Sequence, residues 1–107
     1  MRKVCVYTIC KNEEANIRRW YESVKTADAI IVIDTGSTDE TWNRLLECGD
    51  NVYIEQFIQD GTFDFSVARN FALNRARHIC NSSDEWIYVS LDFDEFISAT
   101  GIDDIRE

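Results

Sequence analysis

Four short, mainly apolar runs along the chain have the length and pattern of β-strands. They cover residues 4–9, 29–33, 51–57 and 86–91. Apolar runs of this length, separated by polar segments, are typical of strands buried in a sheet. The pattern therefore predicts four strands, with an interval between each pair that is long enough for a helix.

The first interval has the spacing of an amphipathic helix. Its apolar residues recur at the i, i+3, i+4 and i+7 positions of one helical face: Ile17, Trp20, Tyr21 and Val24. We predict that this helix begins near Glu13. Asn12 is its predicted cap, because asparagine side chains accept hydrogen bonds from the free N–H groups of a first helical turn.

Two further helices are predicted in the later intervals. One covers residues 38–48, with a Ser-x-x-Glu capping box from Ser37 and Glu40 at its start and Gly49 after its end. The other covers residues 66–80, with Asp64 or Ser66 as its cap. The inward face of this third helix is predicted to consist of Val67, Phe71, Ala72, Ala76 and Ile79.

The alternation of strands and helices indicates the α/β class, with a mostly parallel sheet that carries helices on both faces. In such sheets, ligands bind beyond the carboxyl ends of the strands. Three polar clusters lie at predicted strand ends, at residues 8–14, 34–39 and 92–95. We expect their side chains to converge on one site.

Composition narrows the classes of function. The 107 residues suit one domain, and 20 acidic against 11 basic residues give a formal net charge of -9, which argues against a nucleic-acid partner. The four cysteines lack the Cys-x-x-Cys spacing of a metal site and are predicted to be reduced thiols of a cytoplasmic protein. The sequence predicts neither a signal peptide nor a membrane span.

Two carboxylates follow the fourth predicted strand. Asp92 and Asp94 are two positions apart, so in an extended backbone they point to the same side. Mg²⁺ and Mn²⁺ prefer such oxygen ligands, and Mg²⁺ often takes only one or two carboxylates while a phosphate supplies the rest. An acidic loop that merely closes a strand would look the same, because a lone Asp-x-Asp matches often by chance.

Residues 34–39 join a strand to a helix and offer backbone N–H groups to an anionic or polar ligand. Gly36 allows the backbone to come close to such a ligand. A well-made turn and helix cap would explain the same residues, except for Asp34, whose carboxylate can accept hydrogen bonds from a base or a ribose. Arg69, one turn into the third helix, can bind a diphosphate or pair with an acidic residue.

Four ordered segments of the chain resemble family 2 glycosyltransferases of the GT-A (nucleotide-diphospho-sugar transferase) fold. They are residues 8–17, 32–39, 65–72 and 91–95. The resemblance covers nearly the whole chain. It is strongest to the bacterial branch related to lipopolysaccharide-core glucosyltransferases, which implies a role in cell-envelope polysaccharide.

The resemblance implies roles for particular residues. Asp34 would hold the base or ribose, and Arg69 would approach the diphosphate. Asp94 would bind the metal ion, Mg²⁺ or Mn²⁺, while Asp92 would serve the sugar-nucleotide and the metal. The remaining residues implied to contact the nucleotide-sugar are Thr8, Asn12, Glu13, Gly36 and Ser37. Thr35 departs from the family pattern, because many relatives have a second aspartate there.

The implied reaction is an inverting transfer from a nucleoside-diphosphate sugar, UDP-sugar being the first expectation, at the cytoplasmic side of the membrane. Family members continue well beyond the Asp-x-Asp motif with an acceptor-binding half and a general base, and no residue after Glu95 matches that base. We therefore expect residues 1–107 to form the N-terminal, donor-binding part, which binds nucleotide and metal with little turnover alone, and we assign no catalytic residue.

Two other functions fit the same residues less well. The chain could be a non-catalytic module that binds a partner or dimerises through apolar surface left bare by an absent acceptor half. It could also be a phosphohydrolase whose first Asp-x-Asp carboxylate is the nucleophile. The phosphohydrolase is the weaker alternative, because such enzymes need catalytic segments downstream of that motif.

Overall fold

The computed structural model describes residues 2–82, 84–93 and 101–106. Its strands form one four-stranded sheet in the order β3-β2-β1-β4, and every pairing is parallel. The strands are β1 (Lys3–Cys10), β2 (Ala29–Asp34), β3 (Val52–Gln56) and β4 (Trp86–Ser90). Each matches a predicted run to within two residues at either end, so the predicted parallel sheet is confirmed.

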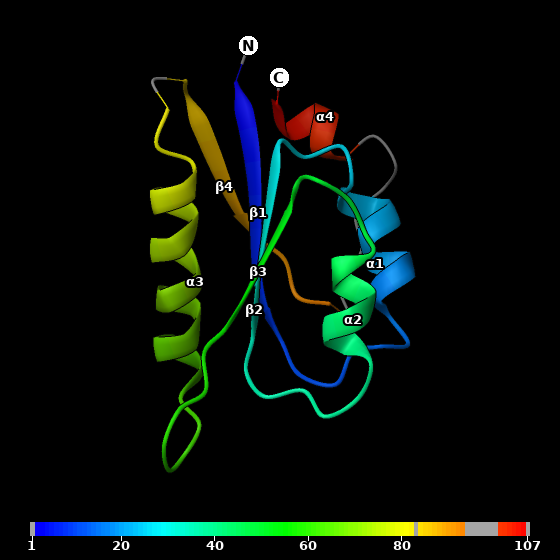
Figure 1. The fold of residues 1–107 in the computed structure, drawn as a ribbon. Helices are drawn as coiled ribbons and strands as arrows, with labels where there is room; N and C mark the ends of the chain where they lie inside the picture. The colour runs from blue at the N-terminus through cyan, green and yellow to red at the C-terminus, as the bar shows by residue number, and fades with distance from the viewer. Residues whose placement is uncertain (1, 83, 94–100, 107) are drawn as a thin grey trace.

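Helices cover both faces of this sheet. Figure 1 shows α3 alone on one face, with α1, α2 and α4 on the other. The helices are α1 (Ile17–Val24), α2 (Thr41–Leu46), α3 (Phe65–Ile79) and α4 (Gly101–Arg106). The predicted α/β class with helices on both faces is therefore confirmed. None of the helices in the described ranges is long and apolar enough to cross a membrane.

β2 is the best-covered strand, because all six of its residues are buried. Successive side chains of a strand point to opposite faces. Accordingly, Ile30 and Val32 pack in the core under α1 and α2, while Ile31 and Ile33 pack in the core under α3. An uninterrupted apolar run is what a strand covered on both faces requires.

The first helix begins later than predicted. α1 starts at Ile17, not near Glu13, and Asn12 does not cap it. Asn12 has a left-handed backbone, with φ of 54°, and its Oδ1 accepts a hydrogen bond of 2.7 Å from the Thr38 N–H. Asn12 therefore does not cap a helix but joins the loop after β1 to the loop after β2, because its side chain bonds to Thr38 and not to the N–H groups of α1.

The second helix is shorter than predicted. α2 covers six residues, and its cap residue Glu40 makes no side-chain capping bond. The predicted capping box is wrong, because the Ser37 hydroxyl donates to Asp34 and the Asp39 carboxylate accepts from the Thr41 N–H. Gly49 does not end the helix either. A side chain at Gly49 would collide with the Tyr21 hydroxyl, so this glycine leaves space for a neighbouring helix.

The third helix follows the prediction except at one position. α3 begins at Phe65, and the Asp64 carboxylate caps it by accepting from the Val67 N–H at 3.2 Å. The predicted inward position of Val67 is wrong, because its side chain is exposed. Ala68, Ala72 and Ala76 are the buried residues, and their small side chains allow the helix to pack closely on β1 and β2.

Helix α4 was not predicted. Its Ile102 is buried in the core beneath α1, and its Arg106 donates to the Asp28 carboxylate and the Thr26 carbonyl, each at 2.9 Å. These contacts lie at the amino-terminal edge of the sheet, opposite the strand ends at which a binding site was expected. α4 therefore contributes to the core and not to that site.

Candidate functional site

The polar clusters that follow β1 and β2 meet at the carboxyl edge of the sheet. Cys10 and Asp34 are register partners at the ends of these two strands. The Cys10 carbonyl accepts two hydrogen bonds from Thr35, one of 2.9 Å from its N–H and one of 3.0 Å from its hydroxyl. β4 ends on the other side of β1, where the Leu91 N–H donates to the Tyr7 carbonyl. The predicted convergence of strand ends is thus present in the described residues.

Two loops at this edge are bound to each other by side chains. The Asn12 N–H donates to the Ser37 hydroxyl at 2.9 Å, and the Glu13 N–H donates to the Thr41 hydroxyl at 2.8 Å. The Asp39 carboxylate accepts from the Thr41 N–H and hydroxyl and from the Glu14 N–H. Desolvation acts to raise the pKa of Asp39, but these hydrogen bonds outweigh it and leave the pKa below its ordinary value.

Asp34 lies beneath the surface of this edge. It is 0% exposed, and its Oδ1 accepts from the Ser37 hydroxyl, the Ser37 N–H and the Gly36 N–H at 2.7, 3.0 and 3.3 Å. This turn requires Gly36, whose φ is 125°, in a region that other residues rarely adopt. Asp34 Oδ2 is buried and has no hydrogen-bond partner within the described residues. Asp34 therefore organises the loop.

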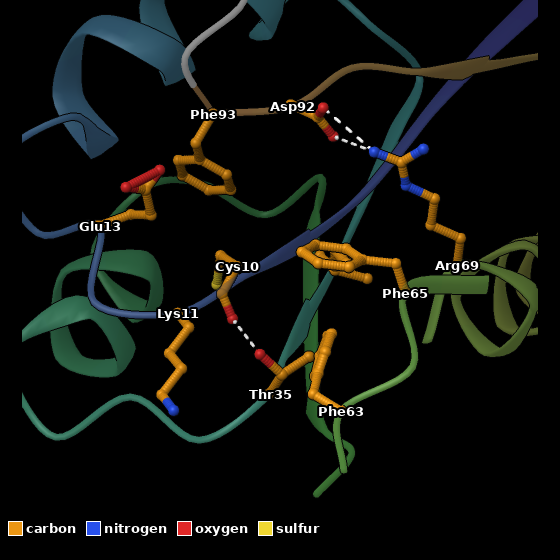
Figure 2. Close-up of a pocket in the computed structure, with 10 residues that line it drawn as sticks. Cys10, Lys11, Glu13, Thr35, Phe63, Phe65, Arg69, Asp92 and Phe93 are labelled. Atoms are coloured by element: carbon orange, nitrogen blue, oxygen red, sulfur yellow. Dashed lines mark hydrogen bonds and ion pairs between the residues drawn. The ribbon is translucent and has the colours of Figure 1, made fainter. Parts of the chain in front are cut away.

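A cleft of about 430 Å³ opens between the strand ends and α3. Figure 2 shows Cys10 and Thr35 near its centre, Phe63 and Phe65 along one side, and Glu13 and Phe93 along the other. The complete lining consists of Ile9, Cys10, Lys11, Glu13, Thr35, Phe63, Phe65, Arg69, Asp92 and Phe93. The cleft thus combines two basic, two acidic and three aromatic side chains.

Arg69 and Asp92 form an ion pair in this cleft. One guanidinium nitrogen of Arg69 lies 3.3 and 3.2 Å from the two carboxylate oxygens of Asp92. The two side chains are 50% and 41% exposed, so water screens the pair. Both groups remain accessible to a ligand, and the ion pair that was the simpler explanation for Arg69 is present.

The other residues implied by the resemblance differ in where they lie relative to the cleft. Glu13 lines the cleft, whereas Asn12, Gly36 and Ser37 belong to the loops beside it. Thr8 is 3% exposed within β1 and donates to the Ile9 carbonyl, so it does not reach the cleft. Asp94 lies outside the described residues.

The described residues bear on the expected metal site. They contain no group of three or more Asp, Glu, His or Cys side chains placed to hold a metal ion. Mg²⁺ commonly takes only one or two carboxylates and completes its shell with water and phosphate oxygens. The half-exposed Asp92 carboxylate at the cleft fits that chemistry as one such ligand.

Seven residues of the cleft lining were not among the predicted site residues: Ile9, Cys10, Lys11, Thr35, Phe63, Phe65 and Phe93. Lys11 and Phe65 carried a weak signal, because they lie inside segments that were singled out, residues 8–14 and 65–72, and Phe63 lies two residues before the second of these. Phe93 lies within the Asp-x-Asp motif and stacks on Trp20 with ring centroids 4.2 Å apart.

Burial and then the nearby carboxylates raise the pKa of the Cys10 thiol well above its ordinary value. Burial therefore favours the neutral thiol of Cys10, which is 5% exposed.

A second hollow, of about 620 Å³, lies between α1 and α2. Its lining comes from the outer surfaces of these helices and includes Arg18, Glu22, Glu40 and Arg44. It lies away from the strand ends, where parallel sheets bind ligands. The cleft at the strand ends is therefore the candidate site.

Sequence comparison identifies the class of protein that has this sheet and this cleft. Residues 5–96 match the model of glycosyl transferase family 2. The chain belongs to this family, and its parallel α/β sheet agrees with the expected GT-A type.

Individual relatives agree with this membership. An uncharacterized glycosyltransferase of Rickettsia bellii is 32% identical over 106 residues, which are 98% of this chain and 32% of that protein. One of Rickettsia typhi is 39% identical over 59 residues, which are 54% of this chain and 20% of that protein. The chain thus spans about a third or less of the length of these relatives. No solved structure matches the chain significantly.

Proposed function

We propose that this chain is the donor-binding part of a family 2 glycosyltransferase and that the cleft binds a nucleoside-diphosphate sugar together with a divalent metal ion. The observation that supports this most directly is the cleft at the carboxyl edge of the parallel sheet, where Arg69 and Asp92 stand side by side. An arginine suits the diphosphate and a carboxylate suits the cation that accompanies it. Family membership supports the same class of reaction.

Each residue of the proposed site would have a separate role in binding the donor and the metal ion. Arg69 and Lys11 would bind the diphosphate oxygens, and Asp92 with Asp94 would hold Mg²⁺ or Mn²⁺. The metal would supply Lewis-acid stabilisation of charge on the departing diphosphate. The buried Asp34 would keep the loop of residues 34–37 in place beside the ligand. In the complete enzyme, an acceptor hydroxyl would then displace the diphosphate with inversion at the anomeric carbon.

Calorimetric titration of UDP into the 107-residue protein tests this proposal. With Mn²⁺ present, we expect saturable binding that Asp94→Asn weakens at least about tenfold, since a hard cation depends on its few carboxylates. Asp104→Asn is the matched control, because it removes the same charge from an exposed position on α4. Its UDP affinity should equal that of the wild type.

The alternatives predict other outcomes. A partner-binding module would bind no UDP under any condition. A phosphohydrolase would release inorganic phosphate from a phosphomonoester, which this proposal does not expect. Either result would contradict the donor-site assignment.

A further inference from the structure

One wall of the cleft is made of two phenylalanine rings that the proposed diphosphate and metal contacts do not use. Phe63 and Phe65 both line the cleft and are 39% and 65% exposed. Their ring centroids are 4.7 Å apart and the rings meet edge to face at 77°. Ligand pockets are commonly lined by aromatic side chains together with a few polar groups, so these exposed rings are candidate ligand contacts.

Hydrogen bonds and a ring contact hold the segment that carries these rings, which runs from the loop residue Phe63 to the first residue of α3, Phe65. The Gln59 amide makes two hydrogen bonds with the backbone of Asp64, donating to its carbonyl at 3.0 Å and accepting from its N–H at 3.1 Å. Before the loop, Phe57 stacks on Phe71 of α3 at 4.2 Å. After it, Asp64 caps α3. The two rings are therefore positioned before any ligand arrives, which reduces the entropy lost on binding.

The Phe65 ring also lies beside the positively charged side chain of Arg69. Phe65 and Arg69 are four residues apart on α3, so they lie on the same face of that helix. Figure 2 shows the Phe65 ring on the same side of the cleft as the Arg69 guanidinium. The flat Phe65 ring beside the Arg69 guanidinium, which we propose binds a diphosphate, would suit a ligand with a planar ring at one end and phosphates at the other.

We propose that Phe65, braced edge-on by Phe63, stacks against the nucleobase of the donor while Arg69 faces its diphosphate. This inference rests on the proposed function and assigns the base to the α3 side of the cleft. The expectation from resemblance placed the base at Asp34, but that carboxylate is buried and does not line the cleft. Every nucleobase has a π face, so this wall should favour nucleotides over other diphosphates without choosing strongly among bases.

The test compares UDP with inorganic pyrophosphate, both titrated in the presence of Mn²⁺. For Phe65→Leu, which keeps apolar bulk but removes the π face, we expect the UDP affinity to fall about fivefold to tenfold, in line with typical stacking contributions. Pyrophosphate affinity should stay within about twofold of the wild type, because pyrophosphate has no base to stack. Phe65→Tyr should restore UDP binding.

Tyr53→Leu is the matched control, because Tyr53 is an exposed aromatic residue of β3 outside the cleft. It should leave both affinities unchanged. Thermal unfolding of each variant checks that the fold persists.

The possible outcomes distinguish the stacking proposal from the donor-binding function on which it rests. If Phe65→Leu weakens UDP and pyrophosphate equally, Phe65 acts by positioning Arg69 and the stacking assignment is overturned. If Phe65→Leu leaves the UDP affinity unchanged while Asp94→Asn still weakens UDP binding, the donor-site proposal holds and the base lies elsewhere. If the wild type binds neither UDP nor pyrophosphate, the donor-site proposal and the stacking proposal for Phe65 are both contradicted.

Discussion

Arg69 and Asp92 form an ion pair in the cleft, and this pairing leads to opposite expectations for metal binding and nucleotide binding. A cation that binds Asp92 must compete with the guanidinium that lies 3.2 Å from its carboxylate. Arg69→Gln should therefore raise the affinity for Mn²⁺ alone by up to about fivefold, the limit set by an exposed pair of roughly 1 kcal/mol. With Mn²⁺ present, the same variant should lower UDP affinity about tenfold, because a charge-assisted contact to the diphosphate is lost.

Arg77→Gln is the control for this prediction. Arg77 is exposed in the last turn of the same helix, so its replacement removes an equal charge at a distance from the cleft. Titrations of Mn²⁺ and UDP by calorimetry measure both effects. A parallel loss of metal and nucleotide affinity in Arg69→Gln would contradict the exchange of partners at Asp92.

Single residues of the site could be predicted only in part. Arg69 and Asp92 were found because each lies near a recognisable element boundary, and the fold brings both to the cleft. Asp34 also stands at a strand end, but whether its carboxylate points to a ligand or into its own turn depends on tertiary contacts. Phe63 and Phe65 looked like ordinary apolar residues, because the sequence does not show which apolar side chains remain exposed.

At the scale of elements, the Asp28 carboxylate binds Arg106 of α4 to the edge of the sheet, and protonation of Asp28 in acid should weaken this contact. Asp28 accepts from the Val4 N–H at 2.8 Å and from Arg106 at 2.9 Å. Desolvation acts to raise the pKa of Asp28, but these hydrogen bonds and the Arg106 and Lys3 charges outweigh it and hold the pKa below its ordinary value. Asp28 therefore stabilises the fold above the pKa of the unfolded chain, about 3.9, and loses that contribution as the pH falls through its folded pKa.

Asp28→Asn should lower the free energy of unfolding by about 1 kcal/mol at neutral pH, because the contact with Arg106 loses its charge. It should also flatten the decline in stability below about pH 4. Urea unfolding followed by tryptophan fluorescence, to which the buried Trp20 contributes, measures this across a pH series. Asp104→Asn, at an exposed position of α4, should keep the wild-type acid curve. An Asp28→Asn curve parallel to the wild type would exclude this role for Asp28.

Strands were predicted better than helix starts for a physical reason. A strand buried on both faces, such as β2, must be apolar throughout, so its sequence alone identifies it. A helix start depends on where a capping side chain finds its partner. Asn12 and Ser37 have the right chemistry for caps but bond across the strand-end loops instead. α4 is too short to give a periodic signal, and its place depends on Ile102 and Arg106.

The charge of the whole molecule bears on how an anionic donor can bind. The formal net charge is -9. Within the cleft, the basic Lys11 and Arg69 are balanced by the acidic Glu13 and Asp92. A diphosphate that approaches without a counter-ion therefore meets no net attraction in the cleft and a repulsive field from the rest of the chain. A divalent cation would reverse this balance, whereas an uncharged nucleoside would feel neither effect.

We accordingly predict that removal of Mn²⁺ with a chelator lowers the affinity for UDP at least about tenfold and changes the affinity for uridine by less than about twofold. Uridine shares the base that Phe65 would stack but lacks the phosphates, so it separates the charge effect from the aromatic wall. Competition with a fluorescent nucleotide measures both ligands in one buffer. Equal dependence of uridine and UDP on the metal would mean that the cation shapes the cleft instead of neutralising the diphosphate, and the electrostatic argument would then fail at the scale of the molecule.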